Sequence, residues 1–582
     1  MTTHIDIETR STVDISAGVH AYAEQAEILI MCWAIDDGPV QTWTINDGTP
    51  LPRLPPPYAA HNSQFERVLL HCAGWDTNPT QWDCTATRAR QHNLPASLGD
   101  CAKALNLTHQ KDRRGAALIR KFSTPPYAET TDPDFADFVD YCRQDVEVER
   151  AIHHALAPIQ EPEVWHLDQR INDRGIKIDR ELVRALTQID TEQRRRLDIE
   201  LRNLTGLDNP NSPAQLKQWL ADNGLQLPDM TKATIAAASS SDATVSRVLD
   251  IRRQTSQSAS KKLASMDTDR ACGILQYWGA GNTGRWAGRR IQPQNMPRGS
   301  VAVTDTLIDT AMTGDLDWVQ SLYGDDVQGI IGSLLRACLV GDLAVADYSA
   351  IEARVLAWCA GEEWVLEEFR GEGKIYEATA AKMYGITKEH VTKAQRQNGK
   401  GACLGAGYAG GAGAVQAFGI DAGIAQKVID DWRAANPRIV AYWCEVERAA
   451  HSAIRYCGKV FQAGPVAYRA DNFGLWCRLP SGRKIAYPGA ILSGGQVESG
   501  NRRIWKGIWV ENLVQAIARD ILADAIIKCE SAGLNVVLHV HDEIVVDGPG
   551  YDKLVEIMST PPEWAKGLPL RAEGYTAQRY RK

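Results

Sequence analysis

The sequence of 582 residues lacks any apolar run of about 18 or more residues, the length that a membrane-crossing helix needs. Its N-terminus, MTTHIDIETRST, also lacks the basic and apolar blocks of a secretory signal. Its thirteen cysteines include no CxxC pair and no clustered spacing, which excludes a zinc ribbon and a disulfide framework. We therefore expect a cytoplasmic protein with no membrane partner.

The chain also has no excess of basic charge. Its 64 basic and 72 acidic residues give a net charge of -8, so no global sign of a nucleic-acid partner is present. Two segments are nevertheless locally basic, residues 251–266 and the acid-free residues 281–300. They carry Arg252, Arg253, Lys261 and Lys262, and Arg285, Arg289, Arg290 and Arg298. Such segments are typical of phosphate-binding surfaces, and a solvated basic face explains them equally well.

What is present in abundance is core-forming sequence. Hydrophobic residues make up 44% and charged residues 23%, as in a soluble globular protein, and the length predicts about three or four domains. A proline-bearing break at residues 157–163 ends the first part of the chain.

The N-terminal part contains four acids whose spacing brings them together in pairs. Alternation in HIDIET predicts a strand with Asp6 and Glu8 on one face. Glu66 follows Asn62 by four residues, and Asp145 follows Tyr141 by four, so on helices each pair shares a face. Converging carboxylates repel one another unless cations bind, and two hard divalent ions suit oxygen ligands. The pattern indicates two-metal hydrolysis of a phosphodiester, although strand-edge acids are often only solvated.

A second pair of acids lies in the C-terminal part. The apolar run at residues 343–346 ends in Asp347, which predicts a buried strand that delivers a carboxylate at its end. Two β-branched runs flank His541, Asp542 and Glu543, which predicts a hairpin with the acids near its bend. Paired aspartates on adjacent strands can hold two Mg²⁺ ions around a triphosphate, whereas acids at a turn are also ordinary turn chemistry.

Between these acids, four residues repeat at intervals of four. On a helix they form one stripe of two cations, an apolar side chain and an aromatic ring, namely Arg396, Lys400, Leu404 and Tyr408. Cations bind phosphates, and a flat apolar surface suits a sugar and base, so the stripe matches a nucleoside triphosphate.

Taken in order, these motifs resemble the family A DNA polymerases from about residue 160 onward. DYSAIEAR at Asp347, the stripe from Arg396 to Tyr408 and HDE at His541 resemble motifs A, B and C. Residues 1–155 resemble a DEDD-type 3′–5′ exonuclease domain with tyrosine in its third motif. The resemblance implies an α/β multidomain fold: an RNase H-like exonuclease domain over 1–155, then a right-hand polymerase with thumb and start of palm over 160–300, and palm and fingers over 301–582.

The resemblance also implies roles for individual residues. Asp6, Glu8, Glu66 and Asp145 would hold two Mg²⁺ ions in the exonuclease, and Tyr141 would orient the attacking water. Asp347 and Asp542 would hold two more Mg²⁺ ions, with Glu543 in support and Mn²⁺ as a substitute.

The remaining implied roles concern substrates. Arg396 and Lys400 would bind the dNTP, with Lys400 also a proton donor to pyrophosphate, while Leu404, Tyr408 and Glu352 would contact sugar and base. Arg285, Gln515 and His541 would contact the primer-template minor groove, and Lys261 and Lys262 the DNA backbone.

Three features depart from the family pattern. Glu66 stands where aspartate is usual, Leu404 where phenylalanine or tyrosine is usual, and an acidic stretch at residues 305–326 lengthens the path from TGR at residues 283–285 to motif A. No segment corresponds to a 5′ nuclease domain, which favours a bacteriophage source and a place in the host cytoplasm.

We expect DNA synthesis with proofreading of single-stranded 3′ ends in phage DNA replication, together with replisome or processivity factors. The alternatives are a repair or lesion-bypass polymerase with weak editing and a non-enzymatic DNA-binding protein. An RNA polymerase or reverse transcriptase would share paired aspartates, but Glu352 and the exonuclease acids argue against an RNA polymerase.

Overall fold

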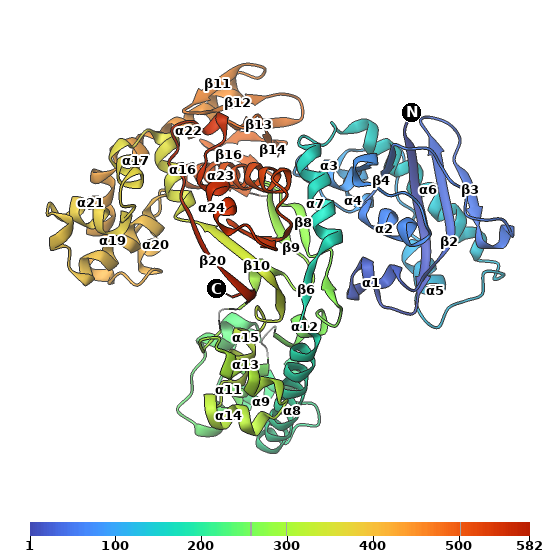
Figure 1. Ribbon diagram of the computed structural model, residues 1–582, viewed down its shortest axis with the longest axis horizontal. Helices are drawn as coiled ribbons and strands as arrows, with labels where there is room; N and C mark the ends of the chain where they lie inside the picture. The colour runs from blue at the N-terminus through green and yellow to red at the C-terminus, as the bar shows by residue number, and fades with distance from the viewer. Residues whose placement is uncertain (256–258, 298, 501, 582) are drawn as a thin grey trace. The chain divides into compact units, whose positions relative to one another are not determined.

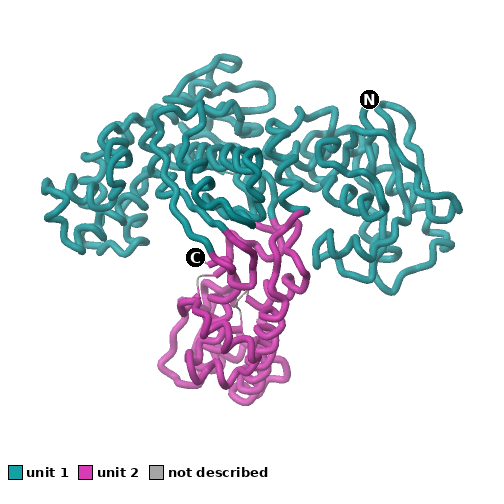
Figure 2. Tube along the Cα trace, in the orientation of Figure 1, with its two compact units in different colours: residues 1–173, 275–287, 344–576 teal, residues 174–274, 288–343, 577–582 magenta. Residues whose placement is uncertain are grey.

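The computed structural model describes residues 1–255, 259–297, 299–500 and 502–581, so Arg298 lies outside the described residues. The chain forms two compact units (Figure 2). Unit 1 comprises residues 1–173, 275–287 and 344–576, and unit 2 comprises residues 174–274, 288–343 and 577–582. The segment 160–300 thus contributes to both units, and the boundaries expected from the sequence remain predictions.

The N-terminal part of unit 1 contains a five-stranded mixed sheet in the order β3-β2-β1-β4-β5 (Figure 1). Strand β1 pairs antiparallel with β2 and parallel with β4. The strands are β1 (Thr3–Ser11), β2 (Ala26–Ile35), β3 (Gln41–Thr44), β4 (Tyr58–Ala60) and β5 (Trp82–Cys84). The helices are α1 (Val19–Ala23), α2 (Gln64–Cys72), α3 (Thr85–Gln91), α4 (Leu98–Ala104), α5 (Gly115–Ser123), α6 (Phe135–Ala155) and α7 (Pro162–Arg174).

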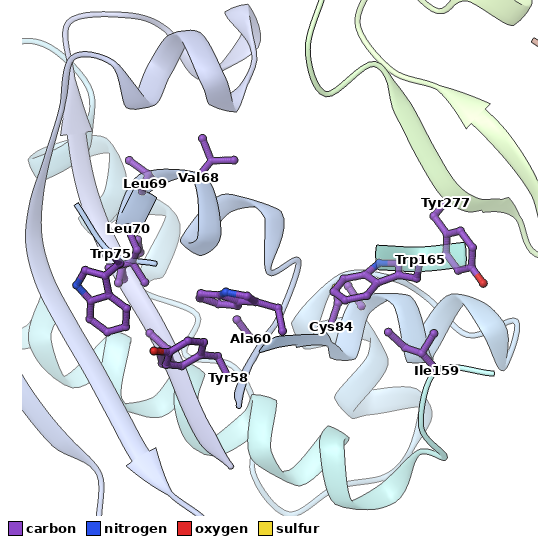
Figure 3. Packing of buried hydrophobic residues seen from close by; sticks show 14 of the residues in the cluster. Tyr58, Ala60, Val68, Leu69, Leu70, Trp75, Cys84, Ile159, Trp165 and Tyr277 are labelled. Carbon is purple, nitrogen blue, oxygen red and sulfur yellow. The ribbon is translucent and has the colours of Figure 1, made fainter. Parts of the chain in front are cut away.

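The pleat of β1 decides which side chains meet which layer. Ile5 and Ile7 belong to a buried aromatic core that includes Tyr58, Trp75 and Trp165, part of which Figure 3 shows. Because side chains alternate along a strand, Asp6 and Glu8 face the other side. There α6 packs against β1 and β2. The predicted alternation is confirmed.

The C-terminal part of unit 1 carries strand order β18-β19-β10, with β20 also paired to β10; residues 339–343 of β10 and 577–579 of β20 belong to unit 2. Its helices are α16 (Ile351–Ala360), α17 (Glu363–Arg370), α18 (Ile375–Tyr384), α19 (Lys393–Ala406), α20 (Ala412–Gln416), α21 (Ala422–Ala435), α22 (Pro437–Arg455), α23 (Lys506–Ser531) and α24 (Tyr551–Ser559). Its strands are β8 (Leu275–Ala280), β9 (Arg285–Gly288), β10 (Leu339–Tyr348), β11 (Val460–Ala463), β12 (Val466–Ala470), β13 (Gly474–Arg478), β14 (Lys484–Pro488), β15 (Ile491–Ser493), β16 (Gln496–Ser499), β17 (Arg502–Ile504), β18 (Val536–Val540), β19 (Glu543–Asp547) and β20 (Ala572–Arg579).

Unit 2 is mainly helical. Its long helix α8 (Arg180–Thr205) begins where the Asp179 carboxylate accepts a hydrogen bond from Leu182 N, and ends at Gly206, whose φ of 69° is left-handed. The other elements are α9 (Pro213–Asp222), α10 (Lys232–Ala237), α11 (Ala243–Thr255), α12 (Ala259–Ala264), α13 (Asp305–Met312), α14 (Leu316–Tyr323), α15 (Val327–Leu334), β6 (Ile176–Ile178) and β7 (Arg270–Ala271).

The acidic stretch at residues 305–326 forms α13 and α14, which pack against α8. Asp315 caps α14 through Trp318 N, and Asp326 caps α15 through Gly329 N. Asp317 pairs with Arg196 of α8 at 2.5 Å. These acids therefore act in helix capping and surface pairing.

Among the described residues, no helix combines the length and the apolar character that a bilayer crossing requires.

Candidate active sites

The structure brings the four N-terminal acids to one place. Asp6 and Glu8 lie on β1, Glu66 lies in the first turn of α2, and Asp145 lies on α6. Asn62 precedes α2 with a left-handed φ of 70°, so the shared helix expected for Asn62 and Glu66 does not form. Tyr141 and Asp145 share α6 as predicted.

The ionisation of these acids shows that they interact. Burial raises the pKa of the Asp6 carboxyl to about 8, and the charge of Asp145 adds to the rise. Burial likewise raises the pKa values of Glu8 and Glu66, and in both cases the charge of Asp6 contributes. Without cations, the cluster therefore resists full ionisation.

Several acceptor atoms in this cluster are available to a cation. Asp6 Oδ2, Glu66 Oε2 and Asp145 Oδ1 are buried and accept no hydrogen bond from any described residue. Buried carboxylate oxygens without donors are costly to maintain. They are also the ligands that Mg²⁺ prefers. The donor set thus fits the divalent ions that the sequence implied.

Lys111 reaches the same cluster, although no sequence spacing marked it. Its Nζ donates a hydrogen bond to Asp145 Oδ2 at 2.9 Å and lies 5.1 Å from the centroid of the Tyr141 ring. The Tyr141 ring packs over Gly115, where a Cβ would lie 2.2 Å from a ring carbon. A glycine is therefore required beneath this tyrosine. The only signal in the sequence was the basic string KDRR at residues 111–114.

The C-terminal acids also meet. Tyr348 N, one residue after Asp347 in β10, donates a hydrogen bond to Asp542 O at 3.2 Å. Strands β18 and β19 form the predicted hairpin, in which Val540 pairs with Glu543. His541 and Asp542 form its two-residue bend, where His541 has a left-handed φ of 58°. The hairpin thus holds Asp542 beside the end of β10, and Glu543 is buried next to it.

A small pocket adjoins this hairpin. Its lining is Arg285, Trp286, Ile351, Glu352, Ala518, Arg519, His539, His541 and Asp542. Within it, Glu352 Oε2 accepts a hydrogen bond from Tyr408 Oη at 2.5 Å, and Glu352 Oε1 accepts one from Arg285 at 3.4 Å. Burial raises the pKa of the Tyr408 hydroxyl well above its usual range, so this hydroxyl remains a donor.

The predicted stripe is only partly helical. Arg396, Lys400 and Leu404 lie on α19, but the helix ends at Ala406 and Tyr408 lies in the following turn. Propensity explains this difference, because glycines dominate this end of the segment. Leu404 is 43% exposed. Arg396 Nε donates to Glu377 Oε1 at 2.6 Å.

The predicted DNA contacts differ in their surroundings. Gln515, on α23, donates to Glu511 at 3.1 Å. Lys261 is exposed on α12. Lys262 is 6% exposed, and its Nζ donates to Ile291 O at 2.7 Å, which contradicts the expectation that it grips DNA. Burial lowers the pKa of its ammonium group. Lys262 therefore serves the internal packing of unit 2.

A buried ion network supports the turn that carries Arg285. Asp520 accepts hydrogen bonds from Arg483 Nε at 2.6 Å and from an Arg519 nitrogen at 3.2 Å, and all three side chains are at most 2% exposed. Arg483 also donates to Thr283 O at 2.8 Å, and Arg519 donates to Gly284 O at 3.1 Å. No spacing in the sequence indicated this network, because Arg483 is distant along the chain from the neighbours Arg519 and Asp520.

Comparison with known proteins defines the class of this protein. Residues 180–560 match the family described as DNA polymerase family A. The chain is similar to the DNA polymerase of Bacillus phage SP02, with 39% identity over 649 aligned residues covering 100% of both chains. It is 26% identical to DNA polymerase I of Pseudomonas aeruginosa, covering 69% of this chain and 41% of that protein.

A solved structure shows a similar fold. It is the POL domain of Pol1 from M. smegmatis in complex with DNA primer-template and dNTP, with a TM-score of 0.62 at 18% identity, covering 98% of this chain and 95% of that one. The chain belongs to DNA polymerase family A and is a DNA-directed DNA polymerase.

Proposed function

We propose that this polymerase extends a DNA primer on a template from dNTPs and edits single-stranded 3′ ends in its N-terminal part. The observation that carries the proofreading proposal is the convergence of four acids whose buried oxygens include three with no hydrogen-bond donor. The mixed five-stranded sheet beneath them is consistent with an RNase H-like exonuclease domain over residues 1–155.

In the polymerase site, Asp347 and Asp542 would hold two Mg²⁺ ions, with Mn²⁺ as a substitute and Glu543 in support. When bound, the ions supply activation of the primer 3′-hydroxyl and neutralisation of the phosphate charge. The backbone bond between Tyr348 and Asp542 supports this assignment, because it fixes the two carboxylate-bearing segments next to each other.

The substrate contacts follow from charge and position. Arg396 and Lys400 bind the triphosphate from one face of α19, and Lys400 delivers a proton to the leaving pyrophosphate. Leu404 offers an apolar surface to the sugar. Glu352 excludes a 2′-hydroxyl, and its bond to Tyr408 holds that ring beside the templating position.

The DNA contacts are assigned to residues near the pocket. Arg285 and His541 line it and contact the minor groove of the primer-template, together with Gln515. Lys261 contacts the backbone from unit 2. Residues 160–300 then correspond to the thumb and start of the palm, and residues 301–582 to the palm and fingers.

In the exonuclease site, Asp6, Glu8, Glu66 and Asp145 would hold two further Mg²⁺ ions. Tyr141 orients the attacking water, since its ring lies beside Asp145 and is fixed over Gly115. Similarity to the phage SP02 polymerase over the full chain supports a role in phage DNA replication in the host cytoplasm, with replisome or processivity factors as partners.

Two alanine variants test both halves of the proposal. Asp542→Ala abolishes primer extension and keeps degradation of single-stranded DNA, whereas Asp6→Ala does the reverse. Asp552→Ala, which changes an exposed acid at the start of α24, is the matched control and keeps both activities. The assay follows matched and mismatched primers with Mg²⁺ and with a chelator.

The two outcomes are independent. Extension by Asp542→Ala at near wild-type rate would refute the polymerase assignment. Unchanged degradation by Asp6→Ala, or no degradation by the wild type, would refute proofreading and favour a repair or lesion-bypass polymerase with weak editing.

A further inference from the structure

Three histidines meet at one end of the β1–α6 interface. His4 is buried on β1, and His153 and His154 occupy the last turn of α6. One ligand nitrogen from each ring lies within 4.8 Å of those of the other two. We propose that these three imidazoles bind a divalent transition-metal ion, with Zn²⁺ as the preferred ion. This site is separate from the carboxylate sites and does not depend on the proposed proofreading activity.

The spacing along the two elements explains how the site forms. His4, Asp6 and Glu8 alternate along β1 and so share one face. Tyr141, Asp145, Glu149 and His153 repeat every four residues along α6. The interface that gathers the exonuclease acids thus continues into the histidines.

A carboxylate orients the His4 ring, and one lies near each of the other two rings. His4 Nδ1 is hydrogen-bonded to Glu149 Oε2 at 2.6 Å, and both side chains are only 2% exposed, so Nε2 is the nitrogen left for a ligand. Asp83 Oδ2 lies 3.7 Å from His153 Nε2, and Asp37 Oδ1 lies 3.4 Å from His154 Nε2. Carboxylates that hold ligand imidazoles are the usual outer partners of protein-bound metals.

One cation lies close to the site. An Arg88 nitrogen is 3.0 Å from His153 Nε2, and the same guanidinium is paired with the Asp83 carboxylate. That pairing offsets its charge. Binding of an ion at His153 Nδ1 requires the ring proton on Nε2, so the Arg88 nitrogen then keeps only its bond to Asp83, and Nε2 donates to the same carboxylate. The acids Asp37 and Glu149 add negative charge on the other sides.

The donor chemistry selects the ion. Imidazole nitrogens suit Zn²⁺, Ni²⁺ and Cu²⁺, whereas Mg²⁺ prefers oxygen. A tetrahedral zinc ion with Zn–N bonds of about 2.0–2.1 Å requires nitrogen separations of about 3.4 Å, so each nitrogen pair must close by at most about 1.4 Å. His154 is exposed and free to make this rotation from the solvent side, while His4 stays fixed by Glu149. Three nitrogens and one water complete the coordination.

The bound ion would tie the first strand of the chain to the end of α6. Those elements carry Asp6 and Asp145, so the ion holds together the framework of the carboxylate cluster without joining it. We therefore expect Zn²⁺ to raise the melting temperature of the full-length protein, because a ligand that binds only the folded state stabilises it.

Cobalt absorption of the full-length protein tests the proposal. Excess Mg²⁺ first saturates the carboxylate sites, and Co²⁺ is then added. Nitrogen-ligated tetrahedral Co²⁺ gives intense visible bands, whereas octahedral Co²⁺ bound to oxygen gives weak ones. The wild type should show the intense bands, and Zn²⁺ should displace them. Calorimetric titration with Zn²⁺ in Mg²⁺ gives the affinity.

Variants then locate the site. His153→Ala and His154→Ala should lose the bands and bind Zn²⁺ at least about tenfold more weakly, and Glu149→Gln should weaken binding about 10–100-fold. His109→Ala, which alters an exposed histidine of the same N-terminal part, should match the wild type. Asp6→Ala should also keep the bands, which separates this site from the proposed nuclease.

Weak bands in the wild type would overturn the proposal. Zn²⁺ affinity of His154→Ala equal to that of His109→Ala would overturn it as well. Because His154 is exposed, its variant should fold, and its metal-free melting temperature provides the check.

Discussion

Asp520 should be the acid whose loss most destabilises the buried ion network beside the polymerase pocket. It accepts hydrogen bonds from Arg483, Arg519 and Ser481, the last at 2.5 Å, in a region nearly closed to solvent. Asp520→Asn removes the charge but keeps one acceptor, leaving two buried guanidinium groups with Glu161 as their remaining acidic partner.

The expected cost follows from the number of bonds weakened. Each hydrogen bond to a charged group contributes about 1.5–3 kcal/mol, and two of the three join opposite charges. Removing one partner of a buried ion pair costs about 3–5 kcal/mol. Since the Arg519 guanidinium still packs on Trp286 at 4.3 Å, we expect the lower end, about 3 kcal/mol.

The two units need not unfold in one step, so the stability of α23 has to be measured locally. Hydrogen exchange of peptides from α23 provides this measurement. A loss of about 3 kcal/mol lowers protection about 100-fold, since 1.36 kcal/mol corresponds to a factor of ten. Asp524→Asn on the same helix is the control: its partner Lys528 is partly exposed, and such pairs contribute at most about 1 kcal/mol. Equal protection in the two variants would refute the argument.

Two further predictions concern ionisation and DNA binding. In chelator, Asp6 has a folded pKa of about 8 against an ordinary 3.8, so the folded state binds the proton more tightly and stability falls as pH rises from about 4 to about 8. Asp6→Asn should make the melting temperature fall less steeply with pH over this range. An unchanged pH dependence would contradict the raised pKa of Asp6. Lys261→Met should make the slope of log K for DNA binding against log[salt] shallower by about 1, which is the contribution of one phosphate contact. Lys262→Met should leave that slope unchanged and lower stability by about 1–3 kcal/mol, because Ile291 O loses its donor, and a changed slope would contradict this.

Local periodicity was sufficient to predict several elements. Alternation placed Asp6 and Glu8 on one face of β1, and β-branched runs predicted the hairpin around Asp542. Both patterns depend only on neighbouring residues and on the two-residue period of a strand. The helix α19 ends before Tyr408 because several glycines lower the helix propensity at that end. The spacing of four residues continues through these glycines and so did not show the end of the helix.

Contacts between distant segments could not be predicted in the same way. Lys261 and Lys262 look equivalent in the sequence. In the structure they lie on different faces of α12, so Lys261 is exposed and Lys262 is buried. Lys111 reaches Asp145 from a loop, and Arg483 reaches Asp520 from another strand pair. No spacing rule connects such residues, because their proximity depends on the packed tertiary structure.

The β1–α6 interface must hold together although its centre repels itself. Burial raises the pKa values of Asp6 and Glu8, and the charge of Asp145 on α6 adds to both; Asp6 Oδ2 and Asp145 Oδ1 have no donor in the described chain. Two contacts stabilise this interface: Lys111 binds Asp145, and His4 binds Glu149 one helical turn further along α6. Each joins a donor group to an acid of the α6 stripe, so both stabilise the interface next to its mutually repelling acids. Such contacts stabilise the interface while leaving one oxygen each of Asp6 and Asp145 available to a cation, as the proposed metal-dependent nuclease requires.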